Sequence, residues 1–158
     1  MLLLAVDPGA GKTASIGVAT FVLATGELKS LGKMSFDEFD AYLLNLDPKT
    51  IGQVVYEMYA IRRQHAMAHI GSEVEVVRSV GLVVAFANRN NIPCVKQPSS
   101  ILGVAPQWFG VKIPRAKNGK KQHVPDEISA MLHGMYWLKG KGIIKTKLEE
   151  EMERNAKM

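Results

Sequence analysis

Residues 1–23 of the chain are MLLLAVDPGAGKTASIGVATFVL, and this stretch decides how the fold begins. An apolar run over Met1–Val6 leads into Asp7, and the Pro-Gly pair that follows is typical of a tight turn. The run Ser15–Ala24 is again apolar and rich in β-branched residues, which favours a second strand. The pattern therefore predicts two strands, with the Asp7 carboxylate presented where the first one ends.

The same stretch contains Gly11-Lys12-Thr13, which looks like the end of a phosphate-binding loop. Such a loop requires an earlier glycine five positions before Gly11, with four residues between them, and a helix whose amides hold the phosphates must follow. Val6 stands where that glycine should be, and the residues that follow favour a strand. Both requirements fail, so we expect no nucleotide cofactor here.

The rest of the chain alternates between strand and helix patterns. Ser35 and Glu38 form a capping-box pattern at the start of a short helix, and Asn90-Asn91-Ile92-Pro93 ends a long one. Three strands precede the first helix, which predicts antiparallel pairing at the start of a mixed five-stranded sheet with helices on both faces. This α/β order is the ribonuclease H-like arrangement, in which the first and fourth strands are neighbours. After the first two strands we expect a strand at Leu28–Met34, a helix at Phe36–Leu46, a strand at Ile51–Met58, a helix at Ala66–Asn91, a strand at Ile92–Lys96, a short helix at Pro98–Val104 and a last helix at Pro125–Lys139.

Length and composition limit the class of protein. The 158 residues are 47% hydrophobic, which suits one globular domain, and we assign residues 1–144 to it and residues 145–158 to a charged C-terminal tail. No apolar run is long enough for a membrane span, so no membrane partner is expected. The single Cys94 excludes a disulfide framework, and we expect a cytoplasmic protein of a bacterium or a phage-infected host cell.

The net charge of +5 favours a polyanionic partner. The tail is neutral, so the positive excess belongs to the body of the protein. Between Gln107 and Gln122 there is no acidic residue. The basic residues of that segment are Lys112, Arg115, Lys117, Lys120 and Lys121.

Three acidic residues stand at element ends in apolar surroundings. Asp7 ends the first strand, Glu57 ends the fourth, and Asp126 begins the last helix. Carboxylates that converge repel one another unless a cation joins them, and oxygen-rich sites of this type suit Mg²⁺ or Mn²⁺. Two such ions can promote an in-line attack of water on a phosphodiester. We therefore predict a metal site that holds two ions, either Mg²⁺ or Mn²⁺.

Three motifs in order resemble the RuvC family of Holliday junction resolvases, particularly its small phage-type members. LAVDPGAGKTASIGVA is similar to the first family motif, VVYEMYAIRRQHA to the second, and HVPDEISAMLHGMYWL to the third. The similarity spans about residues 2–138. It implies a ribonuclease H-like nuclease that hydrolyses phosphodiester bonds in recombination, repair or phage DNA processing.

The resemblance also implies particular site residues. Four metal-binding, catalytic side chains would be Asp7, Glu57, Asp126 and His123, which lies three residues before Asp126 where a carboxylate is commoner. Glu127 is a competing acid, but it should point about 100° away around the helix. The five basic residues above are candidate DNA-binding residues. The segment after Glu57 is also one that the family uses to contact the junction. Its candidate DNA-binding residues are Tyr59, Arg62 and Arg63.

The long helix is apolar on more than one side. Its valine stripe through Val77, Val80 and Val84 is expected to cover the sheet, whereas Val76 and Val83 lie off that stripe. We interpret the second apolar side as a partner surface. The family resemblance implies a symmetric homodimer, which would meet two equivalent cleavage points on a four-way junction.

The leading hypothesis is thus a metal-dependent crossover junction endodeoxyribonuclease that cuts branched DNA by paired symmetric nicks. Two alternatives remain open. One is a related ribonuclease or a less selective flap and fork nuclease, and the other is a junction-binding domain that does not cut.

Overall fold

The computed structural model describes residues 1–9, 15–58, 72–113 and 124–158. The strands are β1 (Leu2–Asp7), β2 (Ile16–Val22), β3 (Leu28–Met34), β4 (Ile51–Met58) and β5 (Cys94–Pro98). The helices are α1 (Phe36–Asn45), α2 (Ser72–Arg89), α3 (Ala105–Phe109), α4 (Asp126–Gly140) and α5 (Lys147–Ala156), with short 3-10 turns η1 (Pro48–Thr50) and η3 (Ser99–Gly103).

The five strands form one mixed sheet in the order β3-β2-β1-β4-β5. β1 pairs antiparallel with β2, and β2 pairs antiparallel with β3. On the other side β1 pairs parallel with β4, and β4 pairs parallel with β5. The predicted fold class is confirmed, including the central β1–β4 pair that brings the ends of these two strands together.

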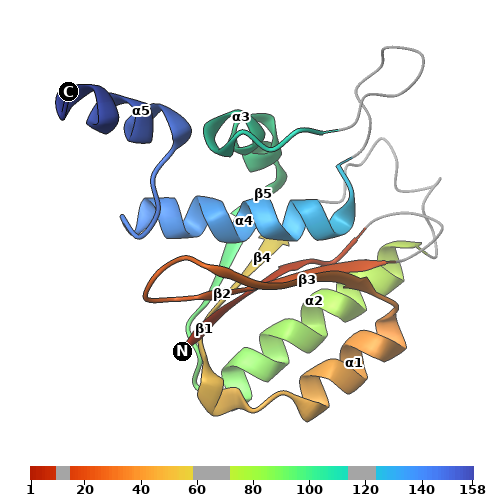
Figure 1. Cartoon of the computed structure of the whole chain (residues 1–158). Helices are drawn as coiled ribbons and strands as arrows, with labels where there is room; N and C mark the ends of the chain where they lie inside the picture. Colours follow the sequence, from red (N-terminus) through yellow and green to blue (C-terminus); the bar gives the residue numbers. More distant parts are fainter. Residues whose placement is uncertain (10–14, 59–71, 114–123) are drawn as a thin grey trace, which may run out of the picture.

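Helices cover both faces of the sheet (Figure 1). α1 and α2 lie against one face, and α4 crosses the other with α3 beyond it. The alternation of side chains along β1 explains this, because Leu4 and Val6 enter the core under α1 and α2, whereas Leu3 and Ala5 enter the core under α4. Asp7 continues the second series, so the fold directs it towards α4.

Most predicted element boundaries hold within one residue, but β2 ends at Val22, two residues before the expected Ala24, and β5 is shifted. Asn91 adopts a left-handed backbone with φ of 54°, and the amide of Ile92 donates to the carbonyl of Ala87 at 2.9 Å. Ile92 therefore completes the end of α2, and the strand begins at Cys94, two residues later than we expected. The expected short helix after it is the turn η3, which is followed by the separate helix α3.

The prediction for the faces of α2 is largely wrong, although Val84 of the predicted stripe packs against the core. Val76 and Val83 are buried at 4% and 0% exposure, whereas Val77 is 56% exposed and Gly81 also faces outward. Val83 packs in the core with Phe86, whose bulk decides which side of the helix meets the sheet. The expected start of this helix before Ser72 lies outside the described residues.

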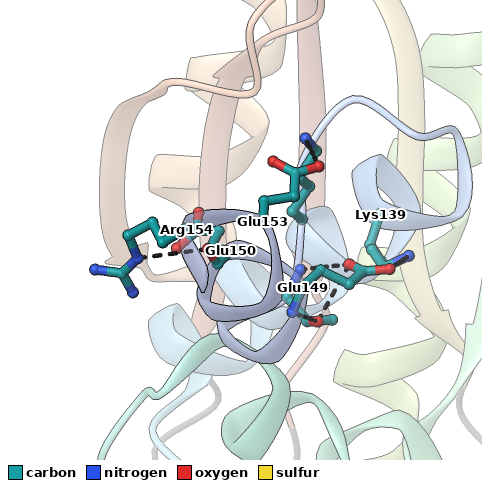
Figure 2. Close-up of polar contacts among 7 residues, drawn as sticks. Lys139, Glu149, Glu150, Glu153 and Arg154 are labelled. Atoms are coloured by element: carbon teal, nitrogen blue, oxygen red, sulfur yellow. Dashed lines mark hydrogen bonds and ion pairs between the residues drawn. The ribbon is translucent and has the colours of Figure 1, made fainter. Parts of the chain in front are cut away.

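The C-terminal tail forms the helix α5, which projects from the body beside α3 and α4 (Figure 1). Thr146 and Glu149 form a capping box at its start. Figure 2 shows Glu149 pointing towards Lys139 of α4, with Nζ and Oε1 3.0 Å apart. None of the α5 residues is buried, so polar contacts rather than a core hold this helix.

In the part of the chain that the structure describes, no helix is long and apolar enough to cross a membrane.

Candidate metal centre

Asp7 and Glu57 lie side by side at the ends of β1 and β4. In the parallel pairing Val6 is opposite Tyr56, so the next residue on each strand is an acid. Each acid stands two residues after a residue that enters the core under α4, namely Ala5 before Asp7 and Val55 before Glu57. Side chains two apart on a strand share one face. The two carboxylates therefore share one face and one edge of the sheet, as the sequence predicted.

Asp126 reaches this edge because the first turn of α4 sits directly on β2. A Cβ added to Gly17 would overlap the backbone carbonyl of Asp126, so only glycine allows this approach. The hydroxyl of Ser15 donates to Oδ2 of Asp126 and links it to the start of the same strand. The third predicted acid is thus brought to the site by a close contact between helix and sheet.

The turn after β1 holds Asp7 in place. Gly9 has φ of 70°, a conformation that side chains disfavour, and its amide donates to Asp7 Oδ1 at 2.9 Å. This contact gives the Pro8-Gly9 turn its function, which is to aim the carboxylate. Asp7 is only 7% exposed.

Among the described residues, Asp7 and Asp126 have no cationic partner. The pKa of Asp7 is raised to about 6, chiefly by burial and further by the neighbouring charges of Glu57 and Asp126. Hydrogen bonds from Ser129 and the Gly9 amide oppose it. A bound cation would relieve the repulsion between these carboxylates.

Three polar residues that the sequence analysis did not assign also belong to this site. Ser129 Oγ lies 3.1 Å from Glu57 Oε2, and His133 Nε2 lies 2.9 Å from the same oxygen. Gln97 Oε1 lies 2.8 Å from His133 Nδ1. Ser129 and His133 follow Asp126 by three and seven residues, a spacing that places all three on one helix face. That spacing was the available signal.

The donor set fits a hard divalent cation such as Mg²⁺ or Mn²⁺, because it consists of carboxylate oxygens, the ligands that these ions prefer. Asp7, Glu57 and Asp126 are the residues that would hold it. Among residues 1–9, 15–58, 72–113 and 124–158, however, no three His, Cys, Asp or Glu side chains are arranged to hold an ion. Glu57 instead bonds to α4, and Asp126 to Ser15.

Several predicted site residues cannot be placed. The candidate ligand His123 lies outside the described residues, as do the candidate DNA-binding residues Tyr59, Arg62, Arg63, Arg115, Lys117, Lys120 and Lys121.

Two further candidates are described. Lys112 is exposed, in keeping with a contact to a polyanion. Glu127 has its Oε2 atom buried, and in the described part of the chain this atom has no hydrogen-bond partner.

No protein-family model matches the sequence, and no curated protein matches it significantly. The fold does match solved structures of RuvC from Thermus thermophilus. One, in complex with a Holliday junction substrate, matches with a TM-score of 0.56 and 14% identity, covering 92% of this chain and 99% of that one. Another RuvC structure from this organism matches with a TM-score of 0.55 and 16% identity over the same shares.

A large terminase nuclease from a thermophilic phage matches less well, with a TM-score of 0.39 and 16% identity over 86% of this chain and 81% of that one. The two RuvC matches establish the class of fold. This chain has the ribonuclease H-like fold in the form found in RuvC, over nearly the whole length of both chains.

Proposed function

We propose that the chain is a metal-dependent endonuclease that resolves four-way DNA junctions by paired symmetric nicks. The observation that carries the proposal is the meeting of Asp7 and Glu57 at one sheet edge beneath the first turn of α4, where Asp126 lies. Three acids from three separate elements share this corner of a RuvC-like fold. A lone strand-end acid would carry no such inference.

The roles of the residues follow from their places. Asp7, Glu57 and Asp126 hold the metal, with His123 or Glu127 as a further ligand. When bound, Mg²⁺ or Mn²⁺, as two ions, would activate water and stabilise the charge on the cleaved phosphodiester. Burial of Asp7 keeps bulk water from screening the site, so its carboxylate interacts strongly with a cation.

The basic residues supply affinity for the DNA backbone. Exposed Lys112 begins the basic segment, and Lys120 and Lys121 lie close in sequence to the metal site. Neutralising Lys120 and Lys121 should weaken junction binding and lower the salt slope of the binding constant by about 0.9 for each lost duplex contact. An unchanged slope would remove these lysines from the DNA contact.

The decisive experiment is incubation of the full chain with an end-labelled four-way junction and Mg²⁺ or Mn²⁺. Paired nicks at symmetric positions on two opposing strands are the expected result. A fork, a flap and an RNA duplex are tested in parallel. Faster cutting of the fork or flap would indicate a less selective nuclease, and cutting of RNA a ribonuclease. Tight binding of the junction without any cut would indicate a junction-binding domain.

A further inference from the structure

His133 is the larger of the two polar residues, with Ser129, that α4 buries completely. Its side chain has 0% exposure, and it stands seven residues after Asp126 on the helix face that meets the sheet. A buried imidazole needs partners for both ring nitrogens, since an unpaired polar atom there is costly. His133 finds both on neighbouring strands, at Gln97 of β5 and Glu57 of β4.

The sheet places these two partners for it. Glu57 pairs with Gln97 in the parallel β4–β5 ladder, so the two side chains lie next to each other on the face under α4. Gln97 is itself only 6% exposed. The ring of His133 is held at Nδ1 and Nε2 at once, by contacts of 2.8 Å and 2.9 Å, and cannot turn without losing one of them.

These contacts constrain the carboxylate of Glu57. An ionised carboxylate only accepts hydrogen bonds, so Nε2 of His133 donates to Oε2. The hydroxyl of Ser129, whose single proton is shared between Glu57 and Asp7, lies 3.1 Å from the same oxygen. Two side chains from α4 therefore contact one oxygen of the carboxylate. Its other oxygen, Oε1, has no hydrogen-bond partner among the described residues.

We propose that His133 is a positioning residue that anchors Glu57 through Oε2 and leaves Oε1 as the oxygen that binds the metal ion. This inference rests on the proposed function, since it assigns Glu57 to a metal. His133 touches neither metal nor DNA in this arrangement. Gln97 holds the ring, the ring and Ser129 hold the carboxylate, and the carboxylate thereby offers one defined ligand atom.

Two substitutions separate positioning from simple packing. His133→Leu fills a similar volume but removes both ring nitrogens, whereas His133→Gln keeps an amide donor near the position of Nε2. Leu138→Val is the matched control, because Leu138 is buried on the same helix at 0% exposure and packs in the apolar core. The melting temperature of the Leu138→Val variant should fall, while its affinity for the metal stays at the parental value.

The readouts are Mn²⁺ binding to the full chain by calorimetry, without DNA, and the kcat and KM of junction cleavage. Loss of a residue that orients a metal ligand typically costs about 10- to 100-fold in metal affinity or activity. We expect His133→Leu to weaken Mn²⁺ binding by about tenfold or more and to lower kcat without raising KM. His133→Gln should recover most of both.

The outcomes distinguish this inference from the proposed function. A parent chain that binds Mn²⁺ more tightly than His133→Leu but cuts no nucleic acid would support the anchoring role and reject the nuclease. A parent that cuts junctions while His133→Leu keeps parental Mn²⁺ affinity and kcat would reject the anchoring role and retain the nuclease. Absence of Mn²⁺ binding by the parent would overturn both.

Discussion

The backbone carbonyl of Asp126 lies so close to Gly17 that a Cβ on Gly17 would overlap it. This contact joins the first turn of α4 to β2 and decides where the third acid of the site stands. Because the obstacle is backbone on both sides, no side-chain rotation can relieve it.

Gly17→Ala should therefore push the start of α4 away from the sheet. We expect a loss of about 1–3 kcal/mol in the free energy of unfolding, typical of overpacking, together with a loss of junction cleavage. Urea unfolding and a cleavage assay measure the two effects. The matched control is Gly32→Ala on β3, where an added Cβ has nothing within 4 Å. Equal losses of unfolding free energy and of junction cleavage in the two variants would contradict the proposed role of this contact.

Asp7→Asn should abolish cleavage and leave junction binding largely intact. The carboxylate would hold metal, whereas exposed basic residues provide affinity for the phosphate backbone. Glu57→Gln should behave in the same way. Cleavage of labelled junctions and gel-shift binding without metal test this pair, and activity within a few-fold of the parent would remove the substituted residue from the site.

Asp7→Asn should also stabilise the metal-free chain against unfolding. Since the pKa of Asp7 rises from 3.8 to about 6 on folding, the folded chain binds the proton more tightly than the unfolded chain does. Stability contributed by this group is therefore present at low pH and lost as pH rises from about 4 to about 6. At pH 7 in chelator, Asp7→Asn should gain about 1–3 kcal/mol in the free energy of unfolding.

Urea unfolding of both chains from pH 4 to 7 measures this gain. The difference between variant and parent should grow across that range and then level off above the folded pKa. A constant difference at every pH would show that Asn changes packing rather than removing a buried charge.

The homodimer that the family resemblance implies should form through the outward side of α2. Val77 is 56% exposed there, and Gly81 beside it leaves open space for a close approach. Val77→Asp should weaken association by about tenfold or more, because a charge left unpaired in an interface costs upwards of about 1.4 kcal/mol. Light scattering at micromolar concentration measures the effect.

Leu148→Glu is the control for exposed apolar residues in general. Leu148 is 65% exposed on α5, which lies on the opposite side of the sheet from α2 (Figure 1). The Leu148→Glu variant should leave the association of the dimer unchanged. A parent that is monomeric and still resolves junctions fully would defeat the homodimer proposal.

His123 remains a predicted ligand three residues before Asp126. His123→Ala should lose most of the cleavage, whereas His123→Asp supplies a carboxylate, the commoner ligand at this place in the family that the sequence resembles, and should keep it. Cleavage rates from pH 6 to 9 compare the three chains. If the alanine variant cuts at the parental rate throughout, the site is made by Asp7, Glu57 and Asp126 without it.

Local patterns were sufficient for much of the site. An apolar strand that ends in an acid is visible in the sequence at both Asp7 and Glu57, and the order of elements predicts that their strands are neighbours. The capping box at Ser35 and Glu38 was also readable and is present, because it depends on residues three apart. Such features are settled by a few consecutive residues.

The faces of α2 show where this reasoning failed. Valines occur on several sides of that helix, so periodicity did not single out one of them, and the sheet-facing side was misassigned. Phe86 and Val83 fill the space left between α2 and the central strands, and this volume requirement decided the outcome. Val77, although apolar, was left in solvent.

The sequence by itself determined the order of strands and helices, the two acids at the ends of β1 and β4, and the acid that opens α4. Only the tertiary structure decided that His133 meets Gln97 and Glu57, which are 36 and 76 residues away from it in the chain. Strand alternation and helix periodicity constrain neighbours along the chain, but they carry no information about which distant side chain lies opposite. That depends on how closely α4 approaches the sheet, and Gly17 allows the approach because it has no Cβ.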